Sequence, residues 1–151
     1  MPHQLIYSST SSTPMQQEDL EDILERAQRN NARSGVTGAL VYVDGCFLQV
    51  LEGEEGAVQG LMERISVDLR HENVTVLQAQ AVDAAAFANW KMAYVSATSA
   101  EVALWAGLSA RTELAETLEN LRIDRQRTMQ ALDGILSVLL HEQRASLGGA
   151  Q

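Results

Sequence analysis

A glutamine and a tyrosine have the side chains and the spacing to form a polar pair inside an apolar sheet. Gln49 lies within the apolar run 47–51, where alternation along a strand places its amide on one face with Phe47 and Leu51. A primary amide has a donor end and an acceptor end, so it needs polar partners among these apolar neighbours. Tyr7 lies on a predicted neighbouring strand and supplies a phenol that donates and accepts hydrogen bonds.

Two predicted helices add an apolar slot with polar ends. Ile23 of the first helix and Ile65 of the second face each other across the slot. A flat heteroaromatic ligand with hydrogen-bonding edges fits such a slot, because isoleucines pack on its faces while amides bind its carbonyl groups and ring nitrogens. The polar residues at the ends of the slot are Asn30, Asn31, Arg64 and Asp68.

The elements that position these residues follow the order β-α-β-β-α-β with one further strand. Two right-handed crossovers then place both helices on one face of an antiparallel sheet, which is the ferredoxin-like α+β fold. Asp44-Gly45 predicts a tight hairpin turn. The expected strands are 5–7, 36–43, 47–51, 74–82 and 90–95, the expected helices are 16–33 and 54–69, and polar connections are expected at 8–14 and 68–73.

A helical extension, residues 98–151, is expected after a first domain of residues 1–97. Thr98-Ser99-Ala100-Glu101 has the pattern of a capping box that opens a short helix, and Gly107 is expected to end it. Apolar spacing predicts helix again over 111–144, either as one helix or as two joined near residues 123–124. We expect these helices to cover the sheet face that the crossover helices leave bare.

Composition excludes several classes of function. The net charge of −9 opposes binding to nucleic acid and to anionic membrane surfaces. The chain contains no apolar leader at its start and no membrane-spanning run of about 20 apolar residues, so we expect a cytoplasmic protein. The single cysteine, Cys46, has no second cysteine for a disulfide or a zinc site, so no metal is expected.

Five motifs follow one another over about residues 5–95, namely Leu5-Ile6-Tyr7-Ser8-Ser9, Arg29-Asn30-Asn31-Ala32-Arg33 with Gly35-Val36-Thr37-Gly38, Phe47-Leu48-Gln49-Val50-Leu51-Glu52-Gly53, Asp68-x-Arg70-His71, and Trp90-x-Met92. In these motifs and their order the sequence resembles the BLUF domains, a family of flavin-binding blue-light sensors. The resemblance implies FAD held noncovalently, with its isoalloxazine ring between the two crossover helices.

The resemblance also implies roles for individual residues. Tyr7 is the light-dependent electron and proton donor, Gln49 bridges Tyr7 and the N5/C4-carbonyl edge of the flavin, and Asn31 fixes the ring at its N3/C4-carbonyl edge. Met92 touches Gln49, whose amide rearranges either by rotation or by a tautomeric change. Trp90 is the aromatic residue that responds to this rearrangement of Gln49. The expected cofactor-binding residues are Tyr7, Ile23, Asn30, Asn31, Gln49, Arg64, Ile65, Asp68, Arg70 and His71, and Asn30 replaces a histidine found in other members.

Other functions remain open at the level of the residues. A small ferredoxin-like hydrolase needs an anion-binding loop with an arginine, but residues 8–13 contain neither arginine nor lysine, so we expect no enzyme activity. A flavin-free protein-interaction module is the second alternative. The stretch 46–49 faintly resembles the reactive-cysteine motif of LOV sensors, but it follows a hairpin turn and lacks the surrounding motif.

Since we expect no effector domain after the sensor, the signal is expected to pass to an unidentified partner protein or through a homo-oligomer.

Overall fold

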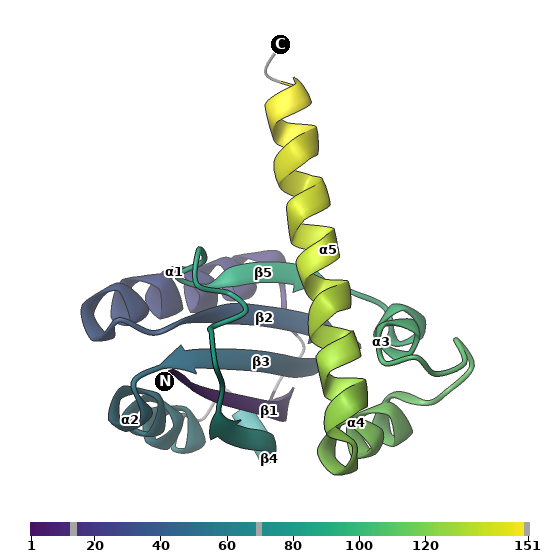
Figure 1. Ribbon diagram of the computed structural model, residues 1–151, viewed down its shortest axis with the longest axis horizontal. Helices are drawn as coiled ribbons and strands as arrows, with labels where there is room; N and C mark the ends of the chain where they lie inside the picture. The colour runs from purple at the N-terminus through teal and green to yellow at the C-terminus, as the bar shows by residue number, and fades with distance from the viewer. Residues whose placement is uncertain (13–14, 69–70, 150–151) are drawn as a thin grey trace. The chain divides into compact units, whose positions relative to one another are not determined.

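The computed structural model describes residues 1–12, 15–68 and 71–149 and divides into two units, residues 1–96 and residues 97–151. The first unit is built on a five-stranded sheet with the strand order β4-β1-β3-β2-β5 (Figure 1). Neighbouring strands are antiparallel except for β2 and β5, which are parallel. The strands are β1 (His3–Ser11), β2 (Thr37–Val43), β3 (Cys46–Gly53), β4 (His71–Ala81) and β5 (Ala93–Ser96). This confirms the predicted ferredoxin-like sheet with one added strand.

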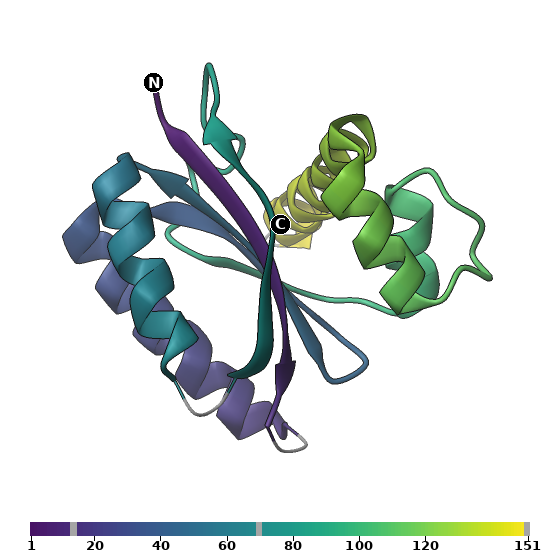
Figure 2. The same cartoon turned by 90° about the horizontal axis from the view of Figure 1, so that it is seen from below.

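Two helices, α1 (Gln17–Ser34) and α2 (Glu55–Ser66), lie on one face of this sheet (Figure 2). The start of α1 is capped by Asp19, whose carboxylate accepts a hydrogen bond of 3.0 Å from the backbone N–H of Gln16. The helix ends at Gly35, which takes a left-handed conformation with φ of 73° and donates its N–H to the carbonyl of Asn31. Asn31 is therefore held in the last turn of α1.

The hairpin between β2 and β3 fixes the register of the central strands. Asp44 and Gly45 have φ values of 46° and 77°, as a two-residue turn with both central residues left-handed requires. From this turn the register runs to Gln49, which lies between Leu40 of β2 and Tyr7 of β1. The predicted pairing of the tyrosine strand with the glutamine strand is confirmed.

Several predicted boundaries are wrong. The serine-rich segment 8–11 continues β1 instead of forming a loop, because it pairs with β3 on one side and β4 on the other. The second helix ends at Ser66, and β4 starts already at His71. Trp90 and Met92 precede β5 and do not belong to it, because β5 pairs with β2 only over residues 93–96.

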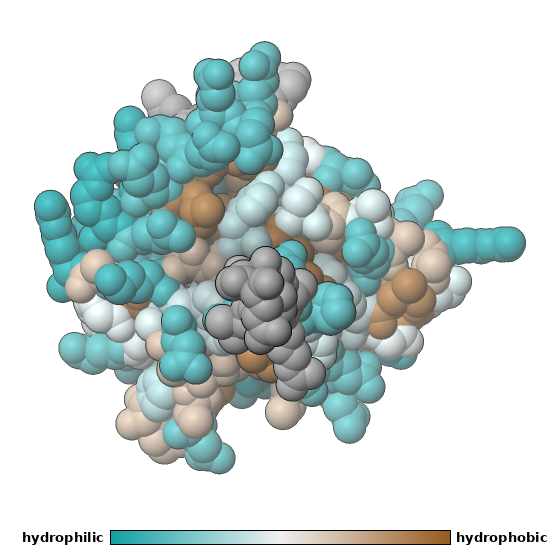
Figure 3. Space-filling view, turned by 90° about the horizontal axis from the view of Figure 1, so that it is seen from above, coloured by the Kyte–Doolittle hydropathy of each residue, from teal (hydrophilic) through white to brown (hydrophobic). Residues whose placement is uncertain are grey.

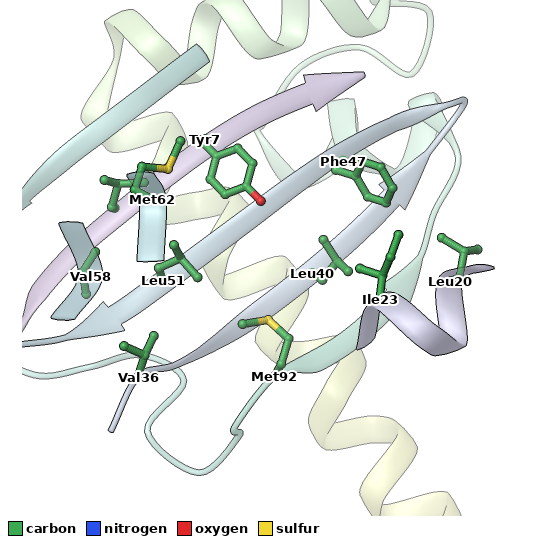
Figure 4. Packing of buried hydrophobic residues seen from close by; sticks show 11 residues of the cluster. Tyr7, Leu20, Ile23, Val36, Leu40, Phe47, Leu51, Val58, Met62 and Met92 are labelled. Carbon is green, nitrogen blue, oxygen red and sulfur yellow. The ribbon is translucent and has the colours of Figure 1, made fainter. Parts of the chain in front are cut away.

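The core of the first unit lies between the sheet and the two helices (Figure 4). Side chains from the sheet face that carries α1 and α2 pack against side chains of these two helices. Val36 and Met92 join the cluster from segments that connect helices and strands. The buried members are Leu5, Tyr7, Leu20, Ile23, Val36, Leu40, Phe47, Leu51, Val58, Met62 and Met92. The phenol of Tyr7 and the thioethers of Met62 and Met92 thus belong to an otherwise aliphatic and aromatic core.

The second unit contains α3 (Ser99–Trp105), α4 (Leu114–Ile123) and α5 (Arg125–Gly149). The predicted capping box is present, because Thr98 accepts a hydrogen bond from the N–H of Glu101 and the Glu101 carboxylate accepts one from the N–H of Thr98. Asp124 is extended and separates α4 from α5, so the predicted helical stretch is two helices. That these helices cover the sheet face left bare by α1 and α2 stays a prediction.

Surface polarity agrees with the acidic composition. The face drawn in Figure 3 is mostly hydrophilic, and its hydrophobic side chains form small separate patches. Within the part of the chain that the structure describes, no helix combines the length and the hydrophobicity that a membrane crossing requires.

Candidate functional site

A cleft opens between α1, α2 and the central strands of the first unit. It contains about 610 Å³ of empty space, a volume that includes space open to solvent. Every predicted cofactor-binding residue that the structure describes lines this cleft, namely Tyr7, Ile23, Asn30, Asn31, Gln49, Arg64, Ile65, Asp68 and His71. Arg70 lies outside the described residues.

Tyr7, Gln49 and Met92 form a hydrogen-bonded chain that begins in the cleft. The phenol of Tyr7 donates to Oε1 of Gln49, and Nε2 of Gln49 donates to the thioether sulfur of Met92 at 3.4 Å. The three side chains are buried, with exposed fractions of 0%, 5% and 2%. Tyr7 comes from β1 and Met92 from the segment before β5 (Figure 4). The amide that needed a partner therefore has one at each end.

The electrostatic surroundings keep Tyr7 neutral. Burial raises the pKa of its phenol far above the ordinary value of 10, since the phenolate would lose its hydration, and the nearby Asp68 carboxylate adds to this shift. The raised pKa leaves the hydroxyl protonated, so Tyr7 is the donor in its bond to Gln49.

Asn31 presents an acceptor without a partner. Its Nδ2 donates to the backbone carbonyl of Lys91 at 2.7 Å, which fixes the orientation of the amide because an oxygen in that place would face another acceptor. Its Oδ1 is buried and has no hydrogen-bond partner among the residues that the structure describes. A buried carbonyl oxygen without a partner is costly, so this position is suited to a ligand N–H.

Charged and aromatic groups complete the surroundings of the cleft. Arg64 lines it from α2, and Arg26 lines it from α1 while forming an ion pair of 3.2 Å with Asp22. His71 lies with its Nδ1 3.0 Å from the hydroxyl of Ser9, and its ring centroid lies 5.0 Å from that of Phe47. The histidine expected in a polar turn is thus the first residue of β4 and contacts Ser9 of β1.

Trp90 does not line the cleft. It lies in the turn before β5, is half-buried, and has its ring centroid 6.2 Å from that of Phe87 in a T-shaped arrangement. Its backbone is tied to β2, because its carbonyl accepts a hydrogen bond of 3.0 Å from the N–H of Gly38. The turn holds Trp90 beside the segment that carries Met92.

Four residues that line the cleft were not among the sequence predictions. The spacing of residues along the helices could have predicted most of them. The residues from α1 recur at intervals of three and four, as do those from α2 and the segment after it. Leu40 is the register partner of Gln49 on β2. The four residues are Arg26, Ala27, Leu40 and Leu61.

Comparison with known proteins places the same region in a family. Residues 3–93 match the family described as BLUF, sensors of blue-light using FAD. Over 73 residues, 48% of this chain, the sequence is 44% identical to the photoactivated adenylate cyclase subunit beta of Euglena gracilis, of which the match covers 8%. The corresponding subunit of Euglena longa is 34% identical over 119 residues, 78% of this chain and 14% of that protein. The chain thus matches a small part of the length of these relatives.

Solved structures agree with the family match. The photo-activated state of BlsA is 30% identical, with a TM-score of 0.74 and coverage of 88% of this chain and 93% of that chain. The dark state of BlrB, a BLUF protein, is 24% identical, and a TM-score of 0.70 over 91% of this chain and 96% of that chain shows the same fold. With the family match extending over most of the first unit and its cleft, this chain belongs to the BLUF family of blue-light sensors that use FAD.

Proposed function

We propose that this chain senses blue light through Tyr7, Gln49 and Met92, with FAD in the cleft between α1 and α2. Membership of the family makes the chain a sensor and not an enzyme over residues 3–93, and it makes FAD the cofactor. The observation that carries the proposal is the buried hydrogen-bonded chain from the phenol of Tyr7 through the Gln49 amide to the Met92 thioether.

The cleft residues fit a flavin. Oδ1 of Asn31 would accept a hydrogen bond from an N–H group at the edge of the ring, which would give this buried oxygen the partner that it lacks within the described protein. Ile23 and Ile65, which line the cleft from the two helices, would pack on the faces of the ring. Asn30, Arg64 and Asp68 would bind polar parts of FAD. The bound FAD supplies absorption of blue light and an acceptor for one electron.

Tyr7 would supply that electron and then a proton. A phenol that loses an electron becomes strongly acidic, so its proton would pass along the existing bond to Oε1 of Gln49, while the amide nitrogen would release a proton toward the reduced flavin. Gln49 would then rotate or change its tautomer, and its bond to Met92 would be rearranged. Because a thioether sulfur is only a weak acceptor, this bond is easily exchanged. The altered hydrogen bonding of the amide would shift the absorption of bound flavin to longer wavelength.

The signal leaves the first unit along the chain. Met92 directly precedes β5, and β5 ends at Ser96, where the second unit follows with the capped start of α3. We infer that residues 98–151 are the output element, acting on an unidentified partner protein or on a homo-oligomer interface. The names of the cyclase relatives, in which light controls an enzyme, support such a transfer of signal. A cytoplasmic location is part of the same proposal.

Absorption spectra of the purified protein test this function. We expect a yellow protein that releases FAD on denaturation and shows a small, reversible red shift under blue light. Tyr7→Phe keeps the ring but removes the phenolic proton, so it should bind FAD and show no red shift. Tyr42→Phe, which removes the hydroxyl of a half-buried tyrosine on β2, is the matched control and should switch normally.

Three outcomes would contradict the proposal. A colourless protein would support the flavin-free interaction module. A normal red shift in Tyr7→Phe would show that Tyr7 is not the donor. Loss of the whole flavin band in light, with a covalent adduct on Cys46, would replace the amide mechanism by a thiol mechanism. Burial and the nearby Asp44 raise the pKa of the Cys46 thiol, which disfavours the reactive thiolate.

A further inference from the structure

A fully buried glutamate, Glu52, lies on β3 three residues beyond Gln49. Its exposed fraction is 0%. Its carboxylate accepts hydrogen bonds from Nε2 of Gln4 at 2.9 Å, from the backbone N–H of Ala86 at 2.8 Å and from the backbone N–H of Phe87 at 2.7 Å. Gln4 is its register partner on β1, whereas the two backbone groups come from the connection between β4 and β5.

The geometry requires a carboxylate at this position. Three N–H donors converge on the two oxygens of Glu52, which carries no donor of its own when ionised. A glutamine has one oxygen and one NH₂ group, so its NH₂ would face an N–H donor and leave at least one of them without an acceptor. A buried backbone N–H without a partner is destabilising.

The residues that Glu52 holds lead directly to Trp90 and Met92. Phe87 is fully buried, and its carbonyl accepts a hydrogen bond of 3.0 Å from the N–H of Trp90. Its ring also lies against that of Trp90. Glu52 therefore fixes the start of a short segment, residues 86–92, whose end carries the thioether that meets Gln49.

The far end of this segment is attached to the cleft. The carbonyl of Lys91 accepts a hydrogen bond from Asn31, and the carbonyl of Met92 accepts one of 3.0 Å from Nε2 of Gln28 on α1. Gln49 also donates to the sulfur of Met92, so the far end of the segment is held by Asn31, Gln28 and Gln49. Asn31 and Gln49 line the cleft, whereas none of the groups bound to Glu52 lines it.

We propose that Glu52 is a positioning residue for the light response. It anchors the backbone of Ala86 and Phe87, keeps Met92 where its thioether meets Gln49 in the dark, and confines the light-induced movement to residues 90–93. This inference rests on the proposed roles of Gln49 and Met92. In this inference the Glu52 carboxylate holds the start of residues 86–92 in place, while the other end of the segment carries the signal out of the cleft.

Hydrogen exchange of the complete, FAD-loaded wild-type protein gives the first test, in darkness and under steady blue light. We expect the amides of Ala86 and Phe87 to exchange at equal rates in both states, within about twofold, because their acceptor does not move. The amides of residues 90–93 should change by about tenfold or more. If the amides of Ala86 and Phe87 change as much as those of residues 90–93, the anchor does not exist and the proposal is wrong.

Glu52→Gln gives the second test. In the dark it should speed exchange of the Ala86 and Phe87 amides by about tenfold or more, since a hydrogen bond to a charged acceptor is lost. FAD should stay bound and the red shift should remain, but the return to the dark spectrum should be at least about threefold slower, because Met92 is no longer held ready for Gln49. Glu54→Gln, the same charge change at an exposed position two residues on, should leave both measurements unchanged.

Further variants separate this role from a general effect on the sheet. Gln4→Leu removes the side-chain donor but leaves both backbone donors on Glu52, so the dark recovery rate should match that of the wild type. A Glu52→Gln protein that is less stable but recovers at the wild-type rate would reduce Glu52 to a structural residue and overturn the proposal. A wild-type protein that shows no red shift would instead refute the proposed function, and the dark exchange rates would still test the anchor.

Discussion

The buried Oδ1 of Asn31, which has no partner among the described residues, predicts a loss of FAD affinity when Asn31 is replaced. Asn31→Ala removes the acceptor that the ring edge needs, so the affinity for FAD should fall by about tenfold to a hundredfold, as expected for one buried hydrogen bond. Titration of the apoprotein with FAD, followed by flavin fluorescence, measures this change. Asn120→Ala makes the same truncation in α4, in the second unit, and should leave the affinity unchanged. Equal affinities for both variants would remove Asn31 from the site.

Tyr7 predicts a dependence of stability on alkaline pH. Its pKa is raised above the ordinary value of 10 by burial and, to a lesser extent, by Asp68. The folded state therefore holds the proton more tightly than the unfolded state. This contribution to stability is fully present below pH 10 and is lost as the pH rises above it, by up to about 1.4 kcal/mol per pH unit.

Urea unfolding of the apoprotein at about pH 9 and about pH 11 checks this sign. Tyr7→Phe has no phenol to ionise, so its free energy of unfolding should decline less over the same interval. Asp68→Asn should keep most of the decline, because burial is the larger cause of the raised pKa. A Tyr7→Phe decline as steep as that of the wild type would place the alkaline transition elsewhere in the chain.

Residues of the site differed in how far the sequence could predict them. Tyr7, Gln49 and Asn31 were found because their motifs occur in a fixed order and two of them lie on adjacent strands. Glu52 lies in one of these motifs, but its role was not predicted, since its backbone donors lie 34 and 35 residues away along the chain. Gln28 was missed for the same reason, because its acceptor is the carbonyl of Met92 in an irregular segment.

At the scale of elements, the order and pairing were predictable and several ends were not. Alternation and the Asp44-Gly45 turn specify the central hairpin locally, so its register was correct. The length of β1 depends instead on β3 and β4, which pair with its serine-rich end although serine has a low strand propensity. The length of β5 likewise depends on β2, with which it pairs only over residues 93–96.

Two glycines differ in the space around them, and we expect their replacement by alanine to have opposite effects on stability. A Cβ atom on Gly38 would lie 1.8 Å from the carbonyl oxygen of Val50, so Gly38→Ala must move one strand and should destabilise the protein by about 3 kcal/mol. Gly60 in α2 has no atom within 4 Å of such a Cβ, and Gly60→Ala should stabilise by about 0.5 to 1 kcal/mol. Chemical denaturation of both variants measures these opposite signs, and equal signs would contradict the packing described.

At the scale of the whole molecule, the two units are linked through one short strand. The sequence predicted a helical second unit but left open whether residues 111–144 form one helix. Asp124 decides this, because it leaves the helical conformation and its Oδ1 accepts a hydrogen bond of 3.0 Å from the N–H of Gln126 at the start of α5. Thr128, which interrupts the apolar pattern, is buried and donates to the carbonyl of Leu121 at 2.7 Å across this junction.

If the second unit carries the output, light must change a property of its helices. The route proposed above runs from Gln49 through Met92 into β5 and on to α3, but proximity along the chain is no proof of coupling. We expect blue light to change amide exchange within residues 98–143, or the molecular mass in solution, by an amount that exceeds the dark replicate error. Gln49→Leu removes both ends of the amide and should show neither change while still binding FAD. Identical exchange and identical mass in the dark and lit wild-type protein would exclude residues 98–151 as the output element, and the signal would then have to leave through the first unit itself.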